Sequence, residues 1–304
     1  MDLDYGSLAE LVALAEARGG TVSELVLEQQ AEQLEEPQEQ LYERMREQYK
    51  VMEASAAQGL KEGVRSASGL TGGDAHRVRQ RLEEGRSLCG PVFAGALARA
   101  MAVAEWNAAM GRIVAAPTAG ACGILPGTLL SLRQALGLGE REVVMALFTA
   151  GAVGLVLSGH FQLAGAKGGC QAECGAASAM AAAAAVELAG GTPFMVENAV
   201  AIALKSSLGL VCDPVAGLVE APCIKRNAAG TATALMAAEL ALAGVASLIP
   251  ADEVMQAMKR VGDAMPPALR ETAEGGLAAT PTAKRLYERV FGKGCEACGA
   301  CAGE

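Results

Sequence analysis

Three cysteines stand at breaks between the apolar segments of an alanine-rich chain. Cys170 lies in GGCQAECG (168–175), directly after two glycines, while Cys212 precedes Asp-Pro and Cys223 follows a proline. The glycines remove side chains that would keep a bulky inorganic group away from the backbone. Because soft metals and iron–sulfur clusters prefer thiolate ligands, the three cysteines predict a buried metal or iron–sulfur site. The long gaps between them match no short metal-binding motif.

A second group of cysteines lies near the end of the sequence, in CEACGAC. Cys295, Cys298 and Cys301 have the two-residue gaps that begin a bacterial ferredoxin motif, but the fourth cysteine followed by proline is absent. A structural zinc site would also lack a fourth local ligand. We interpret this segment as a mobile thiol tail that can reach a metal centre, and redox-sensitive disorder is the alternative.

The other cysteines have simpler interpretations. Cys89 stands among apolar residues and is predicted to be a small buried core residue, whereas the role of Cys122 is left open. Cys174 follows Cys170 by four residues and could share a helix face with it. Packing into the alanine run that follows is the favoured interpretation.

Two glycine-rich loops could bind a small polar ligand. SGLTGGDA (68–75) is not a phosphate-binding Walker loop, because no Gly-Lys-Ser/Thr follows. APTAGACG (116–123) offers Thr118 and backbone N–H groups ahead of a predicted helix start. That arrangement suits a carboxylate or a phosphate.

The elements that position these residues are predicted to be helices throughout. Of the 304 residues 52% are hydrophobic and only 3% aromatic, and β-branched residues never alternate over a long span. The spacing predicts helices that begin at Ser7 and at the Thr21-x-x-Glu24 capping box. Amphipathic helices are predicted over 37–60 and 251–272. The fold class is therefore all-α, with a core built from small aliphatic side chains.

We divide the chain into three parts. Residues 1–60 form an N-terminal helical segment that packs on the rest, and residues 61–290 form a helical domain with buried central helices that carries the candidate metal ligands. Residues 291–304 form a flexible cysteine-rich tail.

Composition also bears on partners and location. A net charge of -9 argues against a nucleic-acid partner, which would need clustered Lys and Arg. The first residues lack the basic and apolar regions of a signal peptide, so we expect a cytoplasmic protein, where nine cysteines are not a disulfide framework. Residues 143–166 are long enough to span a membrane, but their four glycines, with Ser158, His160 and Gln162, favour a buried helix. A membrane-embedded protein is the minor alternative.

Four motifs in order carry a resemblance to a known family. SGLTGGDA, AAPTAGACGILPG, GGCQAECGAASAM and CDPVAGLVEAPCIKRNA are similar to the catalytic α chain of the bacterial iron–sulfur-dependent L-serine dehydratases. The likeness runs from about residue 40 to about 250 and includes the cysteine-rich tail. It implies conversion of L-serine to pyruvate and ammonia, as in amino-acid degradation and gluconeogenesis. The implied cofactor is an oxygen-sensitive [4Fe-4S] cluster, without pyridoxal phosphate.

The resemblance also implies roles for individual residues. The family's cluster ligands correspond to Cys170, Cys212 and Cys223, which leaves one iron open to act as a Lewis acid on the substrate hydroxyl. The residues expected to hold the substrate are Ser68, Thr71, Thr118 and the Gly120 backbone. Lys225 and Arg226 are alternative carboxylate partners, and in an equally weighted alternative both loops only fold the backbone around the cluster.

One part of the family's machinery is missing from this sequence. Members fused into a single chain carry a Ser-His-Thr segment as the expected source of the catalytic histidine, and here the only histidines are His76 and His160. We therefore expect a separate β chain in a hetero-oligomer and assign no catalytic base in this chain. One of the three tail cysteines is expected to occupy the open iron when substrate is absent. Alternatives are a related iron–sulfur lyase acting on cysteine or threonine, and a non-enzymatic metal-binding protein.

Overall fold

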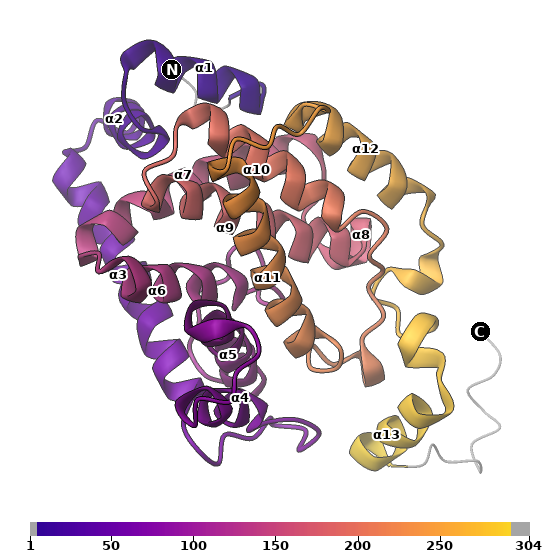
Figure 1. The fold of residues 1–304 in the computed structure, drawn as a ribbon. Coiled ribbons are helices and arrows are strands. Elements are labelled where there is room, and N and C mark those ends of the chain that lie inside the picture. The colour runs from indigo at the N-terminus through magenta and orange to yellow at the C-terminus, as the bar shows by residue number, and fades with distance from the viewer. Residues whose placement is uncertain (1–4, 293–304) are drawn as a thin grey trace.

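The computed structural model describes residues 5–292. Every regular element assigned within these residues is a helix (Figure 1). The all-α prediction is confirmed. One isolated bridge between Cys212 and Arg270 is the only β pairing in this described range. Residues 293–304 of the predicted tail, including Cys295, Cys298 and Cys301, lie outside the described residues.

The first half of the chain contains the α-helices α1 (Leu8–Arg18), α2 (Val22–Leu34), α3 (Gln38–Gly59), α4 (Asp74–Glu83), α5 (Gly90–Ala108), α6 (Ile124–Leu136) and α7 (Glu140–His160). The second half contains α8 (Gly165–Gly168), α9 (Cys170–Leu188), α10 (Pro193–Ser206), α11 (Cys223–Leu242), α12 (Ala251–Ala264) and α13 (Pro281–Phe291). Short 3-10 helices are η1 (Val215–Gly217), η2 (Pro267–Leu269) and η3 (Gly276–Ala279).

Helix α9 lies at the centre of the bundle, in contact with α6, α7, α10 and α11 (Figure 1). Nearly all of its residues are buried, because its run of alanines lets other helices approach on every side. One close approach to α9 is at Gly230 of α11, where an added Cβ would lie 2.9 Å from the Ser178 hydroxyl oxygen. The bundle therefore packs around a helix of small side chains.

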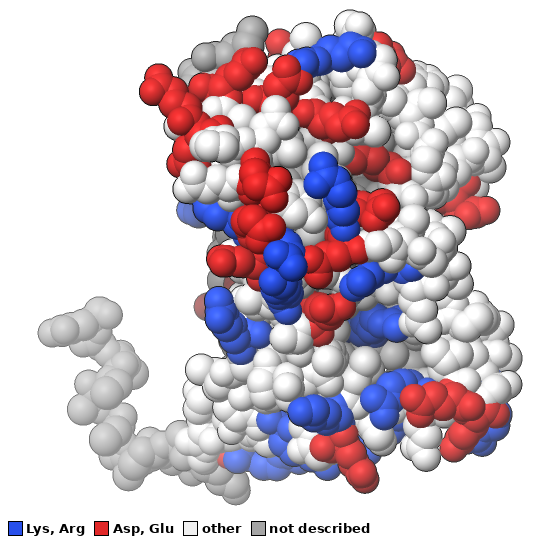
Figure 2. Space-filling view, turned by 90° about the vertical axis from the view of Figure 1, so that its left-hand side faces the viewer, with Lys and Arg blue, Asp and Glu red and all other residues white. Residues whose placement is uncertain are grey.

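The N-terminal helices form as their sequence signals predict. The Ser7 hydroxyl accepts a hydrogen bond from the Glu10 N–H, and both hydrogen bonds of the Thr21–Glu24 capping box are present. Helix α3 buries Leu41 and other residues of its apolar stripe against the bundle. Its outer side is charged, and Figure 2 shows acidic and basic side chains interspersed over the face on which α2 and α3 lie.

Helix α7 is long and apolar enough to cross a membrane by length and composition alone. More than half of its most apolar window is buried, against α9, α2 and α3. A core helix of a globular bundle has these same properties. The predicted buried helix over this region is thus present.

The prediction for Cys89 is wrong. Cys89 lies in the turn before α5 and is exposed, as is its neighbour Leu88 at 93%. The apolar neighbours that suggested a core position are themselves on the surface, so local composition misled the assignment.

The contact between α3 and α5 depends on Gly59, because an added Cβ there would lie 1.9 Å from the Ala102 carbonyl oxygen. We expect Gly59→Ala to lower the free energy of unfolding by about 1–3 kcal/mol through overpacking. Gly151→Ala is the matched control, since a Cβ at Gly151 meets nothing within 4 Å. Better helix propensity should raise its stability by up to about 1 kcal/mol. Urea unfolding followed by circular dichroism measures both, and a Gly59→Ala variant as stable as Gly151→Ala would contradict this close approach.

Candidate metal centre

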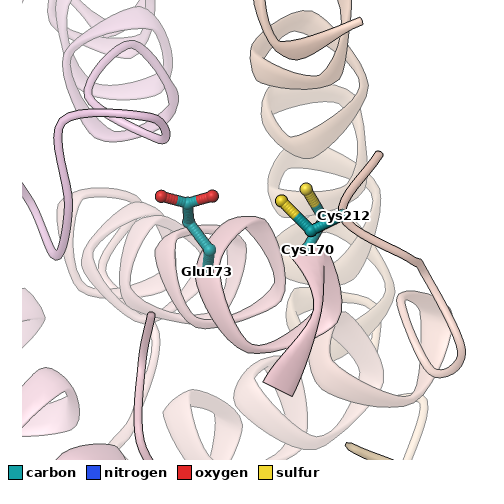
Figure 3. A group of neighbouring side chains, drawn as sticks. All are labelled: Cys170, Glu173 and Cys212. Atoms are coloured by element: carbon teal, nitrogen blue, oxygen red, sulfur yellow. The ribbon is translucent and has the colours of Figure 1, made fainter. Parts of the chain in front are cut away.

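The start of α9 carries two groups that could bind a metal, and a neighbouring segment carries a third. The thiols of Cys170 and Cys212 and the Glu173 carboxylate have ligand atoms within 4.8 Å of one another. Cys170 and Glu173 lie one turn apart on α9, whereas Cys212 comes from the segment that follows α10 (Figure 3). We call these three residues the metal group.

Gly169 allows the Cys212 segment to lie against the first turn of α9. Its φ is 74°, in the left-handed region, and an added Cβ would lie 2.9 Å from the Leu210 carbonyl oxygen. The Gln171 N–H donates to that same oxygen at 2.9 Å, and the Gln171 side-chain oxygen accepts from the Gly209 N–H at 2.9 Å. The glycine before Cys170 therefore serves the approach of protein backbone as well as leaving space at the thiol.

Gly165 leaves room between the ligand atoms. A Cβ at this position would lie 2.9 Å from Cys212 Sγ and 3.3 Å from Glu173 Oε2. On its other side the Cys212 backbone is held by the segment around η2, since the Cys212 N–H donates to the Leu269 carbonyl at 2.8 Å and the Glu271 N–H donates to the Cys212 carbonyl at 2.7 Å. The donor set, two thiols and a carboxylate, fits a soft metal or an iron–sulfur cluster.

Cys223 is the first residue of α11 and is buried, but it is not a member of the metal group. Asn227, one turn later, donates from Nδ2 to the Cys223 carbonyl at 3.0 Å and to the Gly120 carbonyl at 2.7 Å. The Gly123 N–H donates to the Asn227 side-chain oxygen at 2.8 Å. Asn227 thus ties the Cys223 helix start to the loop 116–123. Of the three predicted cluster cysteines, the structure brings two together and holds the third at the start of a helix fixed to the same region.

The thiols differ strongly in acidity. Hydrogen bonds from the Cys174 and Cys212 thiols, aided by the Arg226 charge, lower the pKa of Cys170 to about 3. The same hydrogen bonds and burial raise the pKa values of Cys174 and Cys212. Burial, with the charges of Cys170 and Glu173, raises the pKa of Cys223 to about 12. Cys170 is therefore the thiolate of the group, and Cys174, predicted only to pack, also donates to it.

Glu173 is a site residue that the sequence analysis missed. Burial raises the pKa of its carboxyl group to about 7. The Thr118 hydroxyl donates to Glu173 Oε1, and an added Cβ at Gly120 would lie 2.6 Å from that oxygen. The available signal was its spacing, because a residue three positions after Cys170 lies on the same face of a helix. Thr118 and Gly120 thereby lie beside the metal group, and their role in holding the substrate stays a prediction.

The side chains of Ser68 and Thr71 form hydrogen bonds within their own loop and to a neighbouring segment. The Ser68 oxygen lies 3.2 Å from the Ser66 hydroxyl and accepts from the Leu70 N–H at 3.1 Å. The Thr71 hydroxyl donates to buried Glu220 at 2.6 Å. Among the hydrogen bonds of residues 5–292, neither side chain contacts the metal group. The Thr71–Glu220 bond instead links this loop to the segment that leads into Cys223.

A second residue missed from the sequence supports that loop. Glu105 of α5 is buried, and its carboxylate accepts hydrogen bonds from the N–H groups of Gly73, Asp74 and Ala75, at the start of α4. Burial raises the pKa of Glu105, while those backbone hydrogen bonds oppose the shift. Glu105 follows the start of α4 by about 30 residues, and no local sequence pattern pairs a carboxylate with a helix start at that distance.

The charged and histidine candidates have distinct positions. Lys225 is exposed and pairs with Asp74 at 2.5 Å, whereas Arg226 is mostly buried and pairs with Asp213 at 2.7 Å. His76 Nδ1 lies 3.2 Å from the Leu60 carbonyl oxygen, and His160 Nδ1 lies 2.9 Å from that of Val156. Within the described part of the chain, neither histidine hydrogen-bonds to a metal-group residue.

Comparison with known proteins identifies the family. Residues 17–278 match the family model described as "Serine dehydratase alpha chain". The "Probable L-serine dehydratase, alpha chain" of Bacillus subtilis is 49% identical over 288 residues, which cover 95% of this chain and 96% of that protein. The "L-serine dehydratase, alpha chain" of Peptoniphilus asaccharolyticus is 42% identical over 285 residues, covering 94% and 98%.

A longer relative matches over part of its length. The "L-serine dehydratase TdcG" of Escherichia coli K12 is 45% identical over 183 residues, which cover 59% of this chain and 40% of that protein. The family model spans most of the chain, and two α-chain relatives match it almost from end to end. This protein belongs to the serine dehydratase alpha chain family.

Proposed function

We propose that this chain is the catalytic α chain of an L-serine dehydratase, a lyase that converts L-serine to pyruvate and ammonia in the cytoplasm with a [4Fe-4S] cluster. The observation that carries the proposal is the gathering of Cys170, Cys212 and Glu173 at the start of α9. It occurs in a chain whose α-chain relatives are named for this activity. Amino-acid degradation is the corresponding metabolic role.

The proposed cluster ligands are Cys170, Cys212 and Cys223. Cys170 and Cys212 are already close together, and the Cys223 thiol is buried near enough to Cys170 and Glu173 for their charges to raise its pKa. Gly165 places no side chain against Cys212 Sγ and Glu173 Oε2, which supports an inorganic occupant. When bound, a cluster with one iron free of protein thiolate would supply a Lewis acid for the substrate hydroxyl.

The chain's own residues would bind and orient L-serine beside this group. Glu173 offers a half-buried carboxyl group that would pair with the substrate ammonium when ionised, and Thr118 holds it in place. Gly120 keeps the approach to Glu173 open, since any side chain there would collide with it. Ser68 and Thr71 would shape the loop 68–75. The Thr71–Glu220 hydrogen bond ties this loop to the segment before Cys223.

The base that removes the C2 proton would come from a separate β chain. His76 and His160 each contact a backbone carbonyl through Nδ1, and neither is bonded to a site residue among the described contacts. The "alpha chain" in the names of two relatives supports a hetero-oligomer with such a partner. The β chain would also cover the site.

The first experiment is anaerobic reconstitution of the chain with iron and sulfide. We expect about four irons per chain, and pyruvate from L-serine only when the β chain is added. Cys170→Ser should lose the cluster, because it removes the thiolate of the metal group. Cys89→Ser is the matched control, since Cys89 is exposed and lies in the turn before α5.

Each other outcome has a defined meaning. Full turnover by the α chain alone would refute the shared site, and a chain without iron would refute the metal centre. Faster turnover of threonine or cysteine than of L-serine would identify a related lyase with the same type of reaction and a different substrate. Loss of metal on deleting the last ten residues would favour the non-enzymatic metal-binding alternative, in which the tail thiols are the main ligands.

Thr118→Val tests the substrate-binding role of the loop 116–123. Loss of its hydrogen bond leaves the half-buried Glu173 carboxylate short of a donor, at a cost of about 1–3 kcal/mol. We expect kcat/KM for L-serine to fall by roughly 5- to 150-fold, with the cluster content unchanged. Thr233→Val is the control, because the Thr233 hydroxyl bonds only to its own helix, at the Ala229 carbonyl. Equal kcat/KM values for both variants would refute a role of Thr118 in substrate binding.

The tail cysteines, which lie outside the described residues, have their own test. If one of Cys295, Cys298 and Cys301 occupies the open iron in the absence of substrate, replacing all three with serine should accelerate cluster loss in air. The decay of cluster absorbance after exposure to oxygen measures this. Decay at the wild-type rate would show that the tail does not protect the cluster.

A further inference from the structure

Arg226 links two segments of the metal group. Its side chain comes from the first turns of α11, and Nη1 lies 3.4 Å from Cys170 Sγ and 2.9 Å from the Val211 carbonyl oxygen. Its Nη2 lies 2.7 Å from Asp213 Oδ1. The guanidinium therefore contacts the Cys170 thiol and both residues that flank Cys212.

The acceptors of Arg226 are themselves held in place. The Asp213 side chain is 4% exposed, and its other oxygen accepts from the Leu277 N–H at 2.7 Å. An added Cβ at Gly276 would lie 2.4 Å from that oxygen, so the backbone around η3 closes over the carboxylate. The Arg226 side chain is only 14% exposed. The guanidinium thus lies between Cys170 at the start of α9 and the segment 211–213, and the segment around η3 holds Asp213 in place.

We infer that Arg226 is a positioning residue that holds Cys170 and the Cys212 segment at ligating distance before the metal binds. The inference rests on the proposed metal centre. Cys170 and Cys212 belong to elements far apart in sequence, and the hydrogen bonds of Gln171 reach only the backbone of Gly209 and Leu210. Arg226 adds a side-chain link at the thiol itself, because a planar guanidinium can donate to several acceptors in one fixed geometry.

This role differs from the substrate-carboxylate role that the sequence left open for Arg226. Its guanidinium forms an ion pair with Asp213 and donates to Val211 and Cys170, so its contacts lie on the ligand-bearing segments of the protein. A group that orients metal ligands changes the affinity for the metal in the absence of substrate. A group that binds only the substrate carboxylate leaves metal affinity unchanged and alters KM.

The test is an anaerobic titration of the reduced, metal-free chain with Co²⁺, which reports thiolate binding by its charge-transfer absorbance and requires neither cluster assembly nor turnover. We expect Arg226→Gln to weaken Co²⁺ binding by about 10- to 100-fold and to lower the charge-transfer absorbance per bound ion. Arg226→Lys, which keeps the charge but not the fork, should lie between Arg226→Gln and wild type. Lys225→Gln is the matched control, since the exposed Lys225 pairs with Asp74 instead.

The outcomes separate this inference from the function on which it rests. A wild-type chain that binds no Co²⁺ overturns the metal centre and the inference together. Wild-type affinity and absorbance in Arg226→Gln overturn the inference alone, and a raised KM for L-serine would then assign Arg226 to the substrate. Thermal unfolding by circular dichroism verifies that each variant is folded. If Arg226→Gln does not fold, Arg226→Lys decides, and an affinity equal to that of Lys225→Gln overturns the inference.

Discussion

The small side chains of α9 are the constraint on which the rest of the structure depends. A helix surrounded on all sides must bury every face, and alanine allows this without polar groups to satisfy or large side chains to interlock. Helices α6, α7, α10 and α11 all lie against it. Because these neighbours converge on one helix, the segments that precede or follow them also meet near its N-terminal end. The metal group lies at that end.

The first turns of α11 organise the site more than any other element. Within five residues, Cys223 offers a thiol, Arg226 contacts the Cys170 thiol and the segment around Cys212, and Asn227 bonds to the loop 116–123. A helix keeps such neighbours in a fixed relation, because successive side chains are set by its geometry. One rigid element therefore connects the ligand-bearing segments with the loop that carries Thr118.

Buried charge is balanced locally around this site. The Cys170 thiolate and the Asp213 carboxylate both face the guanidinium of Arg226, and burial of Glu173 shifts its pKa toward neutrality. Isolated buried charges are costly, so such groups persist where they are paired or hydrogen-bonded. In the proposed function this concentration of charge serves ligand binding and the recognition of an amino-acid substrate.

The sequence by itself determined the helical class, the N-terminal caps at Ser7 and Thr21, and Cys170, Cys212 and Cys223 as candidate ligands, of which the structure brings the first two together. These follow from local rules, since caps, breaks and helical periodicity depend on residues within one or two turns. Only the tertiary structure placed Glu173 beside Thr118, Glu105 under the start of α4 and Arg226 on the Cys170 thiol, and it moved Cys89 to the surface. Most of these contacts join segments tens of residues apart, and the exposure of Cys89 depends on which neighbours the fold brings to it. Helical propensity and spacing carry no information on such distances, which are set by how the helices pack around α9.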